Sequence, residues 1–164
     1  MLGGARSGKS RYAESLVMAL PSPWLYVATA EARDSEMAER VAGHRRRRGP
    51  SWTTVETPRD IAGALAASAT KPALVECLTL WLSNVLLADA DVDAEIEHLE
   101  GALARAAAPI VLVANEVGSG IVPDNALSRR FRDLQGLLNQ RIAARADRVF
   151  LVVAGLPLAL KESP

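Results

Sequence analysis

The sequence has little cysteine, no excess charge of either sign and no long apolar run. Cys77 is the only cysteine in 164 residues, which excludes an internal disulfide framework and a zinc site built from cysteines. Lysine plus arginine and aspartate plus glutamate number 19 each, and this zero net charge argues against a general nucleic-acid-binding protein. No apolar run reaches the length of a membrane span, and glycines interrupt the N-terminal segment where a signal peptide needs its apolar region. We therefore expect a cytoplasmic protein with no membrane span.

The composition is that of a folded domain, with 49% hydrophobic and 23% charged residues. The length favours a single domain over residues 1–164. Strand patterns occur at 24–28, 52–56, 73–77, 110–114 and 148–153, which is the last clear strand. Helical patterns lie between them, at 9–20, 34–44, 57–69, 78–87, 94–107 and 127–146. Thr57 followed by Pro58 predicts a capped helix start. This alternation predicts an α/β fold, a mostly parallel sheet with helices on both faces.

Polar residues collect where the predicted strands end. They are Thr29, Glu31, Glu56, Glu76, Asn115 and Glu116. Parallel strands end at one edge of their sheet, and ligands of such sheets bind at that edge. The sequence therefore predicts one shared site there.

A phosphate-binding loop precedes the first predicted helix. It matches G-x-x-x-x-G-K-[ST] at every fixed position and comprises Gly3, Gly4, Ala5, Arg6, Ser7, Gly8, Lys9 and Ser10. Glycines let backbone N–H groups turn toward phosphate oxygens, and the helix N-terminus attracts the same anion. Lys9 would reach the β- and γ-phosphates, and the Ser10 hydroxyl would bind Mg²⁺. We therefore expect a P-loop NTPase-type fold of the RecA-like kind.

Mg²⁺ needs a second protein ligand, and a carboxylate at a strand end is the natural choice. Glu76 is the first candidate, and Glu116 is the alternative for the same role or for substrate binding. Only Met1 and Leu2 precede the loop, whereas a central strand needs about five residues. We expect that the chain begins downstream of its natural start. A truncated first strand should leave an open ladder and a looser loop.

His44 precedes four consecutive arginines, Arg45, Arg46, Arg47 and Arg48. One interpretation is a helix C-terminus at which cations complement the helix dipole. The other is a nucleophile, because neighbouring cations keep the imidazole neutral and can neutralise phosphate charge. An RNA-binding patch is disfavoured by the zero net charge. His98, among glutamates of a predicted amphipathic helix, reads as a surface residue.

Several segments resemble the bifunctional adenosylcobinamide kinase / adenosylcobinamide-phosphate guanylyltransferase family. They are GGARSGKS, LYVATAE, the stretch from His44 to Trp52, VECLTLWLSN, and VANEVGSGIVPDNALSRRFRDLQGLLNQRIAARAD. The resemblance runs in order from Gly3 to the C-terminus, and NEVGSGIVP and FRDLQGLLNQ are more specific than the phosphate loop.

The resemblance implies two reactions. A nucleoside triphosphate, ATP or GTP, first phosphorylates adenosylcobinamide. GTP then transfers GMP to adenosylcobinamide phosphate through a GMP-histidine intermediate, and the family's histidine falls on His44. The resemblance also implies a homotrimer, and nucleotide contacts by the phosphate loop and by Thr29, Ala30, Glu31, Arg45, Arg46, Arg47, Arg48, Glu56 and Glu76.

On this interpretation His44 attacks the α-phosphate of GTP, while Lys9 and the arginines hold the pyrophosphate and Mg²⁺ lies on Ser10 and Glu76. Two other functions remain open. A different small-molecule P-loop kinase would form no covalent GMP adduct, and a GTP-binding switch would turn over slowly and ignore corrinoids. A nucleic-acid motor is disfavoured.

Overall fold

The computed structural model describes residues 1–31, 39, 43 and 49–162. In this part of the chain one sheet has seven strands in the order β3-β2-β4-β5-β1-β6-β7. The strands are β1 (Leu2–Gly3), β2 (Trp24–Ala28), β3 (Trp52–Glu56), β4 (Ala73–Glu76), β5 (Ile110–Asn115), β6 (Arg148–Val153) and β7 (Leu156–Glu162). Every neighbouring pair is parallel except β6 and β7. The predicted α/β fold is thus confirmed.

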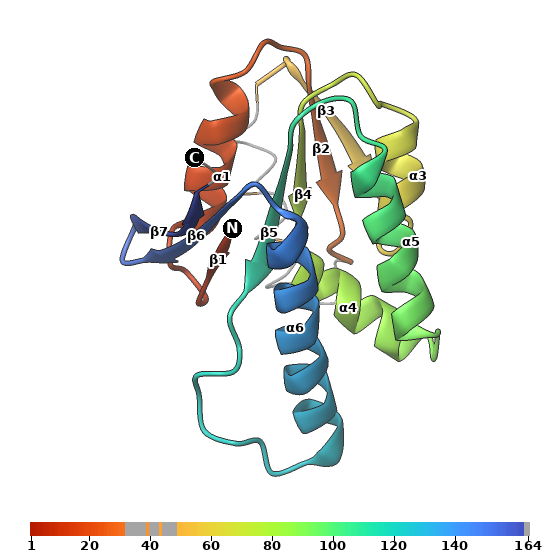
Figure 1. The fold of residues 1–164 in the computed structure, drawn as a ribbon, viewed down its shortest axis with the longest axis vertical. Coiled ribbons are helices and arrows are strands. Elements are labelled where there is room, and N and C mark those ends of the chain that lie inside the picture. Colours follow the sequence, from red (N-terminus) through yellow and green to blue (C-terminus); the bar gives the residue numbers. More distant parts are fainter. Residues whose placement is uncertain (32–38, 40–42, 44–48, 163–164) are drawn as a thin grey trace.

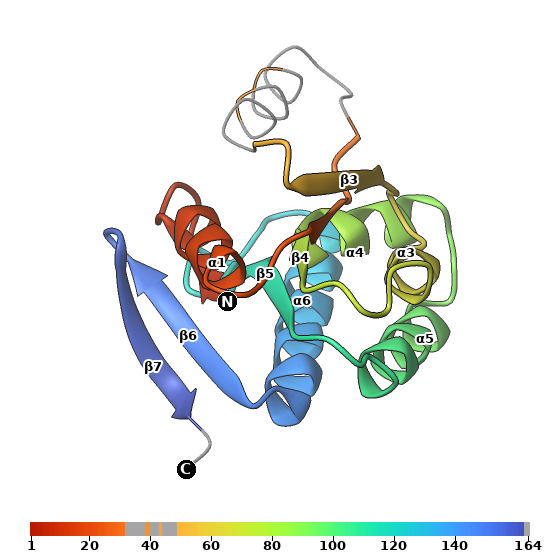
Figure 2. The ribbon, with the colours of Figure 1, turned by 90° about the horizontal axis from the view of Figure 1, so that it is seen from above.

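Helices cover both faces of the sheet (Figures 1 and 2). The helices are α1 (Lys9–Met18), α3 (Ile61–Ala66), α4 (Leu78–Leu87), α5 (Val92–Ala104) and α6 (Ala126–Arg145). Seen from above, α1 lies on one face, and α3, α5 and α6 lie on the other (Figure 2). None of the helices described is long and apolar enough to cross a membrane. The predicted helix at 34–44 falls almost entirely outside the described residues.

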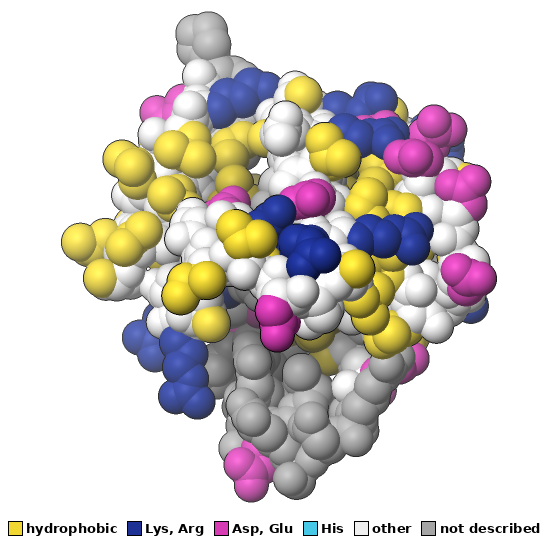
Figure 3. Space-filling view, turned by 90° about the horizontal axis from the view of Figure 1, so that it is seen from below, with side chains coloured by type: hydrophobic (Ala, Val, Ile, Leu, Met, Phe, Trp, Pro, Cys, Tyr) yellow, Lys and Arg dark blue, Asp and Glu magenta, His cyan; other side chains and the backbone are white. Residues whose placement is uncertain are grey.

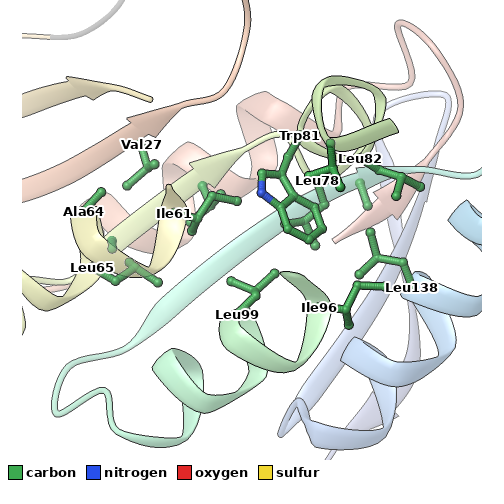
Figure 4. Packing of buried hydrophobic residues seen from close by; sticks show 14 of the residues in the cluster. Val27, Ile61, Ala64, Leu65, Leu78, Trp81, Leu82, Ile96, Leu99 and Leu138 are labelled. Carbon is green, nitrogen blue, oxygen red and sulfur yellow. The ribbon is translucent and has the colours of Figure 1, made fainter. Parts of the chain in front are cut away.

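The larger core lies on the face opposite α1. Trp81 of α4 is 1% exposed and packs among Ile61, Leu99 and other apolar side chains of the surrounding helices (Figure 4). Strands β2 and β4 contribute Leu25, Val27 and Val75 to this cluster. Strands buried on both faces explain why these segments read as continuous apolar runs.

The third predicted helix begins later than Thr57–Pro58 indicated. Its first residue is Ile61, and the Asp60 carboxylate caps it by accepting a hydrogen bond from the Gly63 N–H at 2.7 Å. The Thr57 N–H donates to the Ala28 carbonyl at 2.9 Å, so pairing with β2 continues past the end of β3. The Thr57 hydroxyl does accept a hydrogen bond from the Asp60 N–H at 3.0 Å, as expected of a capping residue, but residues 57–60 are not helical and the helix begins only after Asp60.

Strand β7 was not predicted from the sequence; it is an edge strand whose residues are all exposed. Ala154 and Gly155 form the turn before it, with φ of 52° and 81°. The available signal was the alternation of Leu156, Leu158 and Leu160 after a glycine. Pro157 is tolerated because an edge strand leaves one side unpaired.

The first strand is short, as expected from the two residues before the loop. Leu2 pairs with Ala114 of β5 and Leu151 of β6, and Gly3 pairs with Asn115. The Ala114 N–H also donates to the Met1 carbonyl at 2.9 Å. These bonds join the start of the phosphate loop to β5 and β6 at the carboxyl edge of the sheet.

Candidate functional site

In the phosphate loop, the Lys9 side chain folds back onto the backbone of the loop itself. The Gly4 carbonyl accepts hydrogen bonds from the Ser7 N–H at 3.3 Å and from Lys9 Nζ at 3.0 Å. Lys9 is only 8% exposed, so its ammonium is held against the loop backbone. Helix α1 has no side-chain cap and no acidic residue in its first turn, which leaves its positive end to an anion.

The turn between β6 and β7 supports this loop from outside. The Gly155 N–H donates to the Ser7 carbonyl at 2.8 Å. Gly8, the N-cap of α1, has a φ of 96°, and a Cβ there would lie 3.0 Å from the Gly155 Cα. Gly8 is therefore required by both backbone conformation and close approach. Gly155 could be found only from the tertiary structure, because 147 residues separate it from Gly8.

Ser10 and Glu76 lie together at the carboxyl edge. The Ser10 hydroxyl donates a hydrogen bond to Glu76 Oε1, and the Tyr26 hydroxyl donates to Oε2 at 3.4 Å. A hydroxyl and one carboxylate suit Mg²⁺, which keeps several waters and takes further oxygens from substrate phosphates. No group of three or more metal-binding His, Cys, Asp or Glu side chains occurs among the residues described. The pair thus fits a nucleotide-borne Mg²⁺ better than a metal held by the protein alone.

Glu116, the alternative metal ligand, is turned toward its own loop. Its Oε1 accepts a hydrogen bond from the Gly118 N–H at 2.6 Å, and its N–H donates to the Gly3 carbonyl at 3.1 Å. Of the two candidate carboxylates, Glu76 is the one that accepts a hydrogen bond from the Ser10 hydroxyl.

Thr29 is fully buried and holds the chain just beyond Glu76. Its hydroxyl accepts from the Cys77 N–H at 2.7 Å and donates to the Cys77 carbonyl at 2.8 Å. Asn84 Nδ2 donates to the Thr29 carbonyl at 2.9 Å. The Glu76–Cys77 peptide held in this way is cis. Burial raises the pKa of the Cys77 thiol, which fits a packing residue.

The expectation of a shared edge is confirmed for the described residues. Ala28 lies opposite both Glu56 and Glu76, and Gly3 lies opposite Asn115. Glu31 and Glu56 are exposed at this edge, and Ala30 is half-buried. Nucleotide contacts by Thr29, Ala30, Glu31 and Glu56 stay predictions. His44 and Arg45 to Arg48 lie outside the described residues.

Comparison with known proteins extends the resemblance along the whole chain. The family described as cobinamide kinase / cobinamide phosphate guanyltransferase matches residues 1–160. The chain is 49% identical over 168 residues to the bifunctional adenosylcobalamin biosynthesis protein CobP of Pseudomonas aeruginosa, covering 100% of this chain and 97% of the relative. It is 42% identical over 176 residues to the bifunctional adenosylcobalamin biosynthesis proteins CobU of Salmonella typhimurium and Escherichia coli, covering 97% of each chain. The chain belongs to this family.

Proposed function

We propose that the chain catalyses both reactions named in the family description. It phosphorylates adenosylcobinamide with ATP or GTP, and it then transfers GMP from GTP to adenosylcobinamide phosphate. The products of the second reaction are adenosylcobinamide-GDP and pyrophosphate. The observation that carries this proposal is the phosphate loop with its Ser10–Glu76 pair, in a chain that the family matches from residue 1 to 160.

The loop residues bind and orient the triphosphate in both reactions. The α1 N-terminus and the backbone N–H groups of Gly3 to Ser10 hold phosphate oxygens, and Lys9 moves from the Gly4 carbonyl onto the β- and γ-phosphates. Ser10 and Glu76 would hold Mg²⁺, which neutralises phosphate charge when bound. Glu31, Glu56 and Glu76 surround the nucleotide at the strand ends, with Thr29 and Ala30 in the β2 connection.

His44 is the proposed nucleophile of the second reaction. Its imidazole attacks the α-phosphate of GTP and releases pyrophosphate, and the phosphate of the cobinamide then attacks the GMP-histidine. Arg45, Arg46, Arg47 and Arg48 would stabilise the departing negative charge. Two successive displacements replace one difficult step.

We further propose that the protein works as a cytoplasmic homotrimer. Apolar side chains are exposed along the β6–β7 hairpin, with Val153 59%, Leu156 72%, Leu158 59% and Leu160 54% exposed. Yellow side chains gather on the side of the molecule where this hairpin lies (Figure 3). A face of this kind favours association with another chain. Because the resemblance to the family implies a homotrimer, the proposed partner is a second copy of this chain.

The test is covalent labelling with GTP that carries the radiolabel at its α-phosphate. After incubation with Mg²⁺ and denaturation, we expect protein-bound label that is acid-labile and alkali-stable, and that is absent from His44→Ala. His98→Ala is the matched control, since His98 is exposed on α5, and it should keep the label. Phosphorylation of adenosylcobinamide without any label would leave a kinase alone, and GTP binding without either reaction would indicate a switch.

A further inference from the structure

Asn115 lies at the carboxyl edge of the sheet, at the end of the strand between the phosphate loop and Glu76. It is the last residue of β5, the strand between β1, which carries the phosphate loop, and β4, which carries Glu76. Gly3, where the loop begins, is its register partner on β1. Glu76 is level with Val113, two residues earlier on β5. Asn115 therefore ends between the loop and the proposed metal ligand.

Strand alternation places the Asn115 side chain on the same face as these groups. Val113, two residues before it, packs with Ala13 and Val17 of α1. Leu74, two residues before Glu76, belongs to the same cluster, and Glu76 itself accepts a hydrogen bond from Ser10. The Asn115 and Glu76 side chains thus face α1, the helix that begins at the phosphate loop.

The backbone of Asn115 is held firmly. Its N–H donates to Thr79 Oγ1 of α4 at 2.7 Å, and its carbonyl accepts from Asn139 Nδ2 of α6 at 3.1 Å. Asn139 Oδ1 in turn accepts from Gln135 Nε2 at 2.8 Å, and Gln135 is fully buried. Asn115 and the two α6 amides belong to the NEVGSGIVP and FRDLQGLLNQ segments, for which the proposed reactions give no role.

The carboxamide of Asn115, in contrast, has no hydrogen-bond partner among the described residues, and its Oδ1 is buried. A buried acceptor without a partner is unusual in a folded protein and points to a ligand or an ordered water. A carboxamide offers both a donor and an acceptor. A ligand that satisfies both ends must present an acceptor and a donor side by side. A phosphoryl oxygen next to an alcohol hydroxyl has this chemistry.

We propose that Asn115 is a catalytic residue of phosphoryl transfer, an inference that rests on the proposed kinase activity. Its Nδ2 donates to an oxygen of the γ-phosphoryl group, and its Oδ1 accepts from the attacking hydroxyl of the cobinamide. The hydroxyl oxygen bonds to the γ-phosphorus as the bond from that phosphorus to the β,γ-bridging oxygen breaks. The nucleoside diphosphate leaves with the bridging oxygen, and the hydroxyl proton passes to solvent. Asn139 and Gln135 are positioning residues that hold the end of β5.

This role separates the two reactions of the site. Guanylyl transfer breaks the bond between the α-phosphorus and the α,β-bridging oxygen, and it uses no cobinamide hydroxyl. A contact at the γ-phosphoryl group and the hydroxyl therefore matters to the kinase reaction and little to the transferase reaction.

The experiment compares both reactions in the full-length Asn115→Ala variant. We expect kcat for phosphorylation of adenosylcobinamide to fall about 100-fold, the size typical of losing one donor to a transition state. KM for the nucleotide and the rate of guanylyl transfer to adenosylcobinamide phosphate should stay within about threefold, since phosphate and metal contacts supply that binding. Asn115→Asp keeps the size of the side chain but loses the donor, and it should show the same selective loss. Asn139→Ala should give a kinase kcat between those of wild type and Asn115→Ala.

Asn125→Ala is the matched control. Asn125 caps α6 by accepting from the Ser128 N–H at 2.8 Å, so its loss lowers the melting temperature without changing the kinase kcat. Two results would overturn the inference: kinase activity of Asn115→Ala and Asn115→Asp within threefold of wild type, or parallel loss of both reactions. A wild-type protein that phosphorylates no cobinamide would instead refute the proposed function itself.

Discussion

Glu100 of α5 joins two helices through a buried carboxylate, and its replacement by glutamine should destabilise the fold. Arg141 of α6 donates to Glu100 Oε1 from Nε at 3.0 Å and to Oε2 from Nη2 at 2.8 Å. Arg145 adds a bond to Oε2 at 3.2 Å. The Glu100 side chain is 8% exposed. The hydrogen bonds from Arg141, with a smaller contribution from Arg145, lower the pKa of Glu100 to about 2 from 4.5.

This pKa sets how much the Glu100 carboxylate contributes to the free energy of unfolding, and how that contribution depends on pH. A carboxyl with a pKa of about 2 in the folded protein and 4.5 in the unfolded chain contributes about 3 kcal/mol at pH 7. Because the folded pKa is the lower one, this contribution is complete above about pH 4.5. It is lost as the pH falls toward 2, and less than half remains at pH 3. Glu100→Gln resembles the protonated wild type, so the two proteins should become equally stable in acid.

The assay is urea unfolding of wild type, Glu100→Gln and Glu97→Gln between pH 7 and pH 3. Glu97 lies on the same helix but is exposed, so its replacement should change the free energy of unfolding by no more than about 0.5 kcal/mol. We expect Glu100→Gln to lose about 2–3 kcal/mol at pH 7 and progressively less below pH 4.5. A loss that is constant across this range, or no larger than that of Glu97→Gln, would refute the assignment of stability to the carboxylate.

Two further predictions concern the hairpin. Gly8→Ala should lower the free energy of unfolding by about 1–2 kcal/mol, because φ is 96° and the new Cβ meets the Gly155 Cα at 3.0 Å. The control is Gly136→Ala, inside α6 with open space around it, which should raise the free energy of unfolding by up to about 1 kcal/mol. Equal shifts of the melting temperature in the two variants would contradict the need for glycine at position 8. Light scattering should give roughly three times the 17.5 kDa chain mass, and a monomer mass would exclude the homotrimer.

Local patterns in the sequence were enough to predict the parallel sheet and the phosphate loop. Strands β2, β3 and β6 have the bounds that the sequence predicted. In β2 the signal was a continuous apolar run, because a strand covered on both faces must be apolar. The loop motif predicted the start of α1 at Lys9, since glycines and a helix N-terminus are both needed around phosphate. The gathering of polar residues at the carboxyl edge followed from the parallel direction of the strands alone. Ser10 and Glu76 were predicted to lie together as two metal ligands, and they are in contact.

Only the tertiary structure decided which groups lie around the phosphate loop at the carboxyl edge of the sheet. The Thr57 hydroxyl accepts from the Asp60 N–H as local signals predicted, yet the chain stays paired with Ala28 as far as Thr57, and the helix begins only after Asp60, whose own carboxylate caps it. The Gly155 N–H of the β6–β7 turn bonds to the Ser7 carbonyl, and Asn115 of β5 is the register partner of Gly3, so both reach the phosphate loop from far away in the sequence. Such contacts leave no local pattern, since their energy depends on which chain segments the sheet order brings together. The sequence by itself thus determined the phosphate loop and most of the helices and strands, and the order of the strands determined which groups surround the loop.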